Sequence, residues 1–153
     1  MSILIAAIEN HKDSGIDELC EKYLQRLNGP WKTTLQRLPA ARVKEPDKQK
    51  QIETETLQKI IKPEDVVLLC DENGKTLTST AFSTLIQSKL DTLRGRLIIG
   101  IGGSYGFTPE FMKMHTCIRL SDMTLPHHLA RLLLCEQLYR AMSIQKGSAY
   151  HHA

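Results

Sequence analysis

Hydrophobic and polar positions follow two different periods along this chain. Short, mostly apolar runs are typical of buried strands, whereas apolar residues that recur every three or four positions are typical of helices. The first run is followed by a polar turn and then by apolar residues at helical spacing up to Asn28. The pattern predicts five strands, over residues 2–8, 33–38, 66–70, 97–101 and 116–120.

Helices are predicted between these strands. Their expected ranges are residues 16–27, 52–61, 79–90 and 109–113, and a long last helix from 126 to about 145. Residues 40–51 are expected to form a polar, basic connection. Ser79 and Thr124 are expected to cap helices, because a side-chain hydroxyl can accept from the free N–H groups of a first turn. Strands that alternate with helices predict an α/β fold, a mostly parallel sheet with helices on both faces.

The ligand site of such a sheet lies beyond the carboxyl ends of its strands. Three connections of this chain follow strand ends and contain small or polar residues. They are Cys70 to Lys75, which includes a turn at Asp71 to Gly74, then Gly102 to Gly106, and Ser121 to Leu125. We therefore expect the chemistry of the protein at these three loops.

Composition narrows the class of protein without naming a partner. The chain has 153 residues, of which 41% are hydrophobic, so we expect a single domain over residues 1–153 with a core of its own. No run is long and apolar enough for a membrane span, and no basic stretch opens a signal peptide, so we expect a cytoplasmic protein. The four cysteines are far apart, which favours buried free thiols. A net charge of +3 is compatible with a polyanionic partner but does not identify one.

The glycines after the fourth strand leave two alternatives open. Glycine lets a backbone turn tightly, with or without a ligand close to it. A dinucleotide fingerprint would need a further glycine at position 105, which is Tyr105. Asp122 nevertheless follows the next strand at about the distance of a ribose-binding acid, so a nicotinamide-dependent enzyme remains an alternative.

The last helix is apolar on nearly all sides. Such a helix needs either a central position or a second subunit to cover it, and we expect a homodimer. Arg140 follows Glu136 by four residues, which is the spacing of an intrahelical ion pair. His127 and His128 cannot lie on one helical face, so no metal site is expected.

Several spaced motifs near the C-terminus resemble the RlmH family, the smallest of the SPOUT-type methyltransferases. The motifs are Gly102-Gly103-Ser104-x-Gly106, Ser121-x-Met-Thr-Leu-Pro-His127, Arg131, Glu136-Gln-x-Tyr139-Arg140-Ala141, Ile144 and Gly147-x-x-Tyr150-His151. This chain differs from the family pattern at two places outside these motifs. Relatives tend to have Gly-Lys where this chain has Glu9-Asn10, and leucine where it has Cys70.

The resemblance implies a C-terminal trefoil knot, a homodimer and S-adenosylmethionine as cofactor. It also implies methylation of N3 of a pseudouridine in large-subunit ribosomal RNA on assembled ribosomes, without a metal. The cofactor-binding residues that it implies are Cys70, Gly102, Leu120, Ser121, Asp122, Met123, Thr124 and Leu125. Those implied to hold or activate the target base are Arg131, Arg140, Tyr150 and His151, with His151 as a candidate general base. A ribosome-associated binding module without catalysis is the other alternative.

Overall fold

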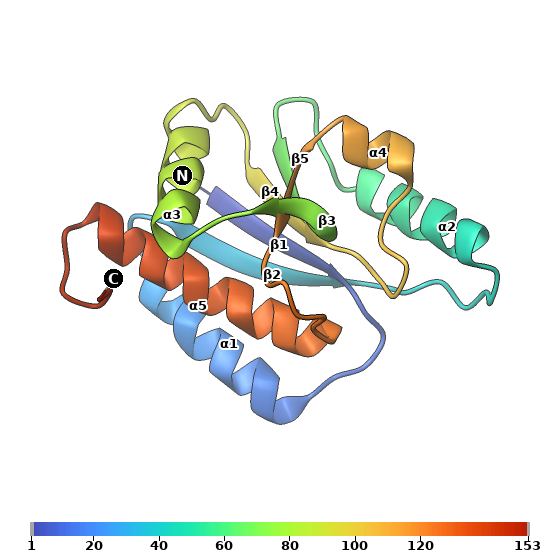
Figure 1. Cartoon of the computed structure of the whole chain (residues 1–153), viewed down its shortest axis with the longest axis horizontal. Coiled ribbons are helices and arrows are strands. Elements are labelled where there is room, and N and C mark those ends of the chain that lie inside the picture. Colours follow the sequence, from blue (N-terminus) through green and yellow to red (C-terminus); the bar gives the residue numbers. More distant parts are fainter. Residues whose placement is uncertain (1, 153) are drawn as a thin grey trace.

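A single sheet of five strands forms the centre of the protein in a computed structural model that describes residues 2–152 (Figure 1). The strands are β1 (Ser2–Ile8), β2 (Lys32–Leu38), β3 (Val66–Thr76), β4 (Leu97–Ile101) and β5 (Thr116–Arg119). Their order across the sheet is β2-β1-β4-β3-β5, and all four neighbouring pairs are parallel. The predicted parallel α/β sheet is thus confirmed.

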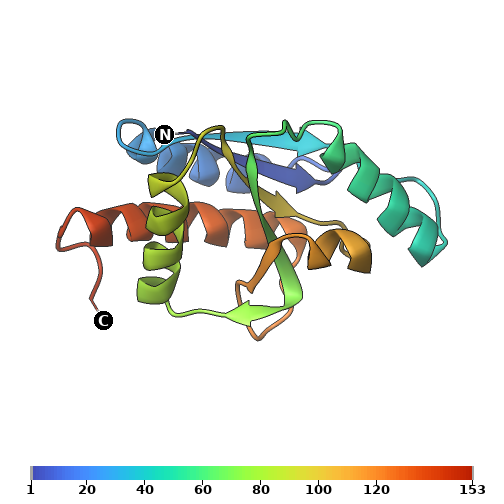
Figure 2. The same ribbon diagram turned by 90° about the horizontal axis from the view of Figure 1, so that it is seen from above.

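Two layers of helices enclose this sheet (Figures 1 and 2). The helices are α1 (Ser14–Leu27), α2 (Pro46–Gln58), α3 (Ser79–Asp91), α4 (Pro109–Lys113) and α5 (His127–Gln145). One apolar cluster joins α1, α3 and α5 to one face of the sheet, and a second joins α2 and α4 to the other face. The prediction of helices on both faces is confirmed.

Strand β1 shows why the central strands of this sheet are nearly continuous apolar runs in the sequence. Successive side chains of a strand point to opposite faces. Ile3 and Ile5 accordingly belong to the cluster with α1, α3 and α5, whereas Leu4 and Ala6 belong to the cluster with α2 and α4. Both faces of β1 are buried, so no polar residue interrupts the run.

The structure corrects the start of one helix and the predicted caps of two others. Helix α2 begins at Pro46 and not near residue 52, because Glu45 caps it by accepting from Asp47 N (3.0 Å) and Lys48 N (2.8 Å). Helix α3 is capped by Thr78 and not by Ser79. Helix α5 starts after Pro126 without a side-chain cap, so the predicted capping by Thr124 is wrong. A polar surface helix such as α2 gives almost no apolar period to recognise.

Strand β3 continues past its predicted end at Cys70 as far as Thr76. Its pairing with β5 is irregular, since the register shifts between Cys70 and Lys75. The residues expected to form a turn, Asp71 to Gly74, lie inside this irregular stretch. Tertiary pairing with β5 therefore extends a strand that its own sequence predicts to be shorter.

Other expectations concern cysteines, membranes and metals. All four cysteines are free thiols, with Cys20 and Cys135 buried and Cys70 and Cys117 half-buried. Within residues 2–152 no helix has the length and apolar character to cross a bilayer. The same residues contain no cluster of side chains that could hold a metal ion. The trefoil knot stays a prediction from the resemblance.

Asp65 and Arg96 join the starts of β3 and β4. Asp65 accepts from the Arg96 backbone N–H (2.9 Å), from Arg96 Nη2 (2.8 Å) and from the Lys62 N–H (2.8 Å). Burial raises the pKa of this carboxyl, but the Arg96 and backbone hydrogen bonds outweigh it and hold the pKa at about 2. The neighbouring strands β3 and β4 are thus aligned at the ends opposite to the three loops.

Asp65→Asn is expected to lower the free energy of unfolding at pH 7 by about 2 kcal/mol, because it removes charge-assisted hydrogen bonds. The pKa of Asp65 is depressed when folded, so its contribution exists above the unfolded pKa of about 4 and is lost as pH falls toward about 2. Urea unfolding at several pH values should show the difference between wild type and variant shrinking over that window. Asp91→Asn, at an exposed carboxylate, is the control. A difference that persists at pH 2 would contradict this assignment.

Candidate active site

The three loops predicted to carry the chemistry meet around one cavity of about 560 Å³. Residues 70–73 after the regular part of β3, 101–107 after β4 and most of 119–125 after β5 line it. A cavity of several hundred Å³ at the carboxyl ends of parallel strands is typical of a small-molecule site. The three loops therefore form one site.

The loop after β4 makes one wall of this cavity with little side-chain bulk. Gly106 has a φ of +76°, which favours glycine, and its N–H donates to Gly103 O at 3.1 Å to close a turn. Phe107 is buried directly after this turn. A ligand can thus approach the backbone closely here, while Phe107 anchors the loop in the core.

The segment between β5 and α5 makes the opposite wall. It leaves the sheet after Arg119, so its peptide groups do not take part in strand pairing. Ser121 Oγ accepts from Met123 N at 3.0 Å, which bends the segment, and Leu120 and Leu125 supply half-buried apolar side chains. Apolar side chains beside free peptide groups suit a flat, polar-edged ring such as a purine.

All but one of the predicted cofactor residues line this cavity. They are Cys70, Gly102, Leu120, Ser121, Met123, Thr124 and Leu125. The remaining one, Asp122, has a side chain that is 76% exposed and pairs with Arg119 at 3.0 Å. An exposed acid that is not part of the lining gives no support to the nicotinamide alternative.

Four further lining residues come from helices, and only His127 among them belongs to one of the motifs. They are Lys50 of α2, Met112 of α4, and His127 and Ala130 of α5. Lys50 lies in the segment expected to be a basic connection. Because part of that segment forms the first turns of α2, the sequence did not predict that Lys50 lines the cavity. The helices reach the carboxyl ends of the strands only through tertiary packing, so these lining residues can be identified only from the structure.

The cavity carries charges of both signs on its lining. Asp71 and Glu72 are acidic, and Lys50 and Arg119 are basic. Cys70 contributes no charge, because burial raises the pKa of its thiol to about 12. A protonated thiol is a poor nucleophile, so Cys70 serves as a lining residue.

Arg131 of α5 lies outside this cavity and is fully buried. Its Nε is 2.9 Å from Glu9 Oε1, and its Nη1 donates to Asp17 Oδ1 at 2.7 Å. Arg37 of β2 pairs with the same two carboxylates. This buried ion network (Glu9, Asp17, Arg37 and Arg131) connects α5 to β1, α1 and β2.

The network keeps Arg131 charged. Burial lowers the pKa of the guanidinium, but the Asp17 hydrogen bond and the Glu9 charge outweigh burial and raise it above its usual value. The two arginines likewise hold the pKa of Asp17 below its usual value against the effect of burial. Glu9, one of the two departures from the RlmH pattern, is thus a structural partner of Arg131.

Arg140, Tyr150 and His151 come together at the other end of α5. Arg140 Nη2 pairs with Glu136 Oε1 at 2.7 Å, which confirms the expected intrahelical ion pair. Tyr150 OH donates to the same Glu136 oxygen at 3.2 Å, and the Arg140 guanidinium lies 4.9 Å from the Tyr150 ring centre. Arg140 Nη1 is 3.1 Å from His151 Nδ1. The tail thus docks on α5 and is no frayed end.

This tail cluster (Glu136, Arg140, Tyr150 and His151) is separate from the cavity of the same chain. Ala130 lines the cavity, and Arg140 follows ten residues later, which on a helix is roughly 15 Å away. Figure 1 shows the C-terminus at the far end of α5 from its connection to β5. One chain alone does not bring all predicted site residues together.

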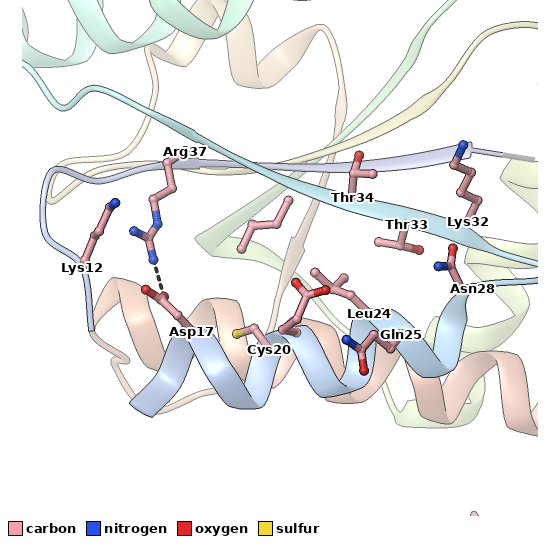
Figure 3. Close-up of a pocket in the computed structure, with 12 residues that line it drawn as sticks. Lys12, Asp17, Cys20, Leu24, Gln25, Asn28, Lys32, Thr33, Thr34 and Arg37 are labelled. Atoms are coloured by element: carbon pink, nitrogen blue, oxygen red, sulfur yellow. Dashed lines mark hydrogen bonds and ion pairs between the residues drawn. The ribbon is translucent and has the colours of Figure 1, made fainter. Parts of the chain in front are cut away.

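A second cavity of about 700 Å³ lies between α1 and β2 (Figure 3). Figure 3 shows Arg37 pointing to Asp17 within it, so these two charges satisfy one another as part of the buried ion network. Its lining contains none of the three loops at the carboxyl ends of β3, β4 and β5. Despite its larger volume, we therefore place the chemistry in the cavity of about 560 Å³.

Comparison with known proteins identifies the family. The family described as "Predicted SPOUT methyltransferase" matches residues 1–151. The chain belongs to the SPOUT methyltransferase family. A Bacteroides fragilis protein named ribosomal RNA large subunit methyltransferase H is 43% identical over 108 residues, or 70% of this chain and 69% of that protein. A Flavobacterium psychrophilum protein of the same name is 37% identical over 99% of both chains. The predicted RlmH resemblance is confirmed.

Solved structures agree with the fold. A probable methylase family protein from Haemophilus influenzae Rd KW20 superposes with a TM-score of 0.55 at 13% identity, covering 95% of this chain. A probable rRNA-methyltransferase from Porphyromonas gingivalis gives a TM-score of 0.53 at 12% identity over 94% of this chain. This chain spans 66% and 69% of the length of those two chains. At such low identity the likeness shows the SPOUT-type fold alone.

Arg131→Met is expected to lower the free energy of unfolding by about 3–5 kcal/mol, because it leaves the buried Glu9 and the partly exposed Asp17 with one arginine between them. Arg140→Met removes a partly exposed pair and should cost about 1 kcal/mol or less. Chemical denaturation of both variants measures the contrast. Equal losses for the two variants would show that the buried ion network does not hold α5 in place.

Proposed function

We propose that the chain is an S-adenosylmethionine-dependent methyltransferase that modifies N3 of a pseudouridine in large-subunit ribosomal RNA. It acts on assembled ribosomes in the cytoplasm, as one domain over residues 1–153 and as a homodimer. The single observation that carries the proposal is the convergence of three strand-end loops on one cavity in a SPOUT methyltransferase chain. The names of its relatives, at 37–43% identity, support the ribosomal substrate.

The cavity suits the cofactor chemically. The glycine loop permits close approach of a ribose or an amino-acid moiety, and Leu120 and Leu125 can enclose an adenine between apolar surfaces. Backbone groups of residues 120–125 can bond the polar edge of that ring. When bound, S-adenosylmethionine supplies a methyl group already activated on a sulfonium. The protein then has to align donor and acceptor and exclude water, for which orientation can contribute ~7–11 kcal/mol.

The residues of the tail cluster are suited to binding the target base and to stabilising the negative charge that develops on it. Hydrogen bonding to Glu136 raises the pKa of Arg140, so it stays cationic and can stabilise negative charge that develops on the target base. Burial and the neighbouring Glu136 raise the pKa of Tyr150 to about 12, so its phenol keeps its proton and can donate a hydrogen bond.

His151 has a restricted role while it is docked on Arg140. A guanidinium has only donors, so His151 Nδ1 must accept in this contact. The lone pair on Nδ1 is then occupied, and in the neutral ring Nε2 carries the proton. We therefore propose that His151 positions the base together with Arg140 in this arrangement. It becomes a general base only when it leaves Arg140.

A homodimer explains why the tail cluster and the cavity lie apart. The outward side of α5 carries partly exposed Leu129, Leu132 and Leu133, which no other element within residues 2–152 covers completely. We propose that this side packs against a second copy, and that the tail cluster of one subunit completes the cavity of its partner. Arg131 acts indirectly, by holding α5 in position.

Purified protein should bind S-adenosylmethionine in calorimetry, and ribosomal RNA from cells lacking the gene should lose one methylated pseudouridine in mass spectrometry. Gly102→Val should abolish both the binding of S-adenosylmethionine and the methylation of the RNA. A Cβ at Gly102 would already lie 3.0 Å from Gly106 Cα, and a valine would distort the loop. Wild-type protein that binds no S-adenosylmethionine at millimolar concentration would disprove the proposed cofactor. An unchanged RNA methylation profile in the deletion strain would disprove the proposed substrate.

A mixture of two inactive variants should recover activity if the site is shared between subunits. Gly102→Val lacks the cavity, and a chain truncated after Ser148 lacks Tyr150 and His151. After unfolding and refolding together at equal amounts, half of the dimers are mixed, and each has one intact site, so about a quarter of wild-type turnover on ribosomes is expected. Each variant refolded alone is the control. Recovery no greater than the sum of these controls would place the tail in its own subunit's site.

A further inference from the structure

Glu53 of α2 is a buried carboxylate with one unused oxygen. Its side chain is fully buried, and Oε2 accepts from Ala41 N at 2.9 Å and from Gln49 Nε2 at 3.4 Å. Oε1 is buried too and has no hydrogen-bond partner among the described residues. Nor does Glu53 pair with any lysine, arginine or histidine in residues 2–152.

The unused oxygen lies directly behind the loop after β4. A Cβ built on Gly103 would be 2.2 Å from Glu53 Oε1, so the carboxylate occupies the space that a side chain at Gly103 would need. Gly103 lines the cavity, whereas Glu53 does not. The carboxylate is therefore separated from the cavity only by the backbone of a glycine.

The next residue of α2 anchors the same loop. Thr54 is buried, and its Oγ1 accepts from Thr108 N at 3.0 Å. Helix α2 thus contacts the loop at Gly103 through Glu53 and just beyond the loop through Thr54. These two contacts keep the Glu53 carboxylate close to the cavity wall.

A buried carboxylate without a cation is costly to maintain, so it calls for a compensating positive charge. Of the two basic residues that line the cavity, Arg119 is paired with Asp122, and neither Arg119 nor Lys50 forms an ion pair with Glu53. The described residues therefore place no cation within ion-pairing distance of Glu53. A cationic ligand would provide the missing charge.

We infer that Glu53 is a specificity-determining residue that makes the cavity favour a cationic ligand over its neutral counterpart. The inference rests on the proposed function: S-adenosylmethionine carries a sulfonium, whereas S-adenosylhomocysteine, its product after methyl loss, carries a neutral thioether at the same atom. Glu53 acts through its field across Gly103 and touches neither ligand. By preferring the charged cofactor, it limits inhibition by the product.

The test is the ratio of the two dissociation constants, measured by calorimetry at low salt. Glu53→Gln keeps the size of the side chain and an acceptor for Ala41 N but removes the charge. It should weaken binding of S-adenosylmethionine relative to S-adenosylhomocysteine by roughly tenfold or more, as expected for a unit charge about 10 Å away at an effective dielectric constant of about 20. Glu55→Gln, on the exposed side of the same helix, is the matched control and should leave the ratio unchanged.

A structural role alone gives a different result. If Glu53 only supported the loop, Glu53→Gln would weaken both ligands equally or neither, and the unchanged ratio would overturn the inference. Thermal unfolding checks that the variant is folded. A second measurement needs no variant: wild type should bind an analogue with an ammonium group in place of the sulfonium more tightly than the thioether. Equal affinity for these two would also overturn the inference, whereas no binding of any of the three ligands would refute the proposed function.

Discussion

The position of α5 depends on one buried guanidinium. Arg131 has no access to solvent, and Glu9, Asp17 and Arg37 complete a balanced network around it. Desolvated charges hold their partners in a specific geometry, because any displacement would leave one of them unpaired. Helix α5 carries the cavity wall at its first turn and the tail cluster at its far end, so both halves of the proposed chemistry depend on this network.

The helices on the two faces of the sheet contribute different residues to the proposed chemistry. Helices α1, α3 and α5 cover one face and contribute Asp17 and Arg131 to the buried ion network and Glu136 and Arg140 to the tail cluster. Helices α2 and α4 cover the other face and reach the cavity through Lys50, Met112 and the carboxylate of Glu53 behind Gly103. The parallel order of β5, β3 and β4 brings the three strand-end loops between these layers. Under the proposals above, Glu53 in one layer would distinguish the cofactor from its product, and the tail cluster in the other layer would hold the RNA base.

Predictions from the sequence were most reliable where one physical signal dominates. The strands buried on both faces, such as β4 (Leu97–Ile101), have unmistakable apolar runs, and their alternation with helices leaves little choice of fold class. The loops after them follow from the general geometry of parallel sheets. Helix α2 was placed six residues too late, because it packs with few apolar residues and its polar face carries no period.

The sequence alone determined the α/β class, the three loops of the candidate site and the ion pair between Glu136 and Arg140, because all of these depend on local spacing. Only the tertiary structure decided that Arg131 is a buried structural cation, that Asp122 is not part of the cavity lining and that Glu53 lies behind Gly103. Each of these facts depends on which residues from distant parts of the chain meet, and on how much water their contact excludes. Spacing along the chain carries neither kind of information.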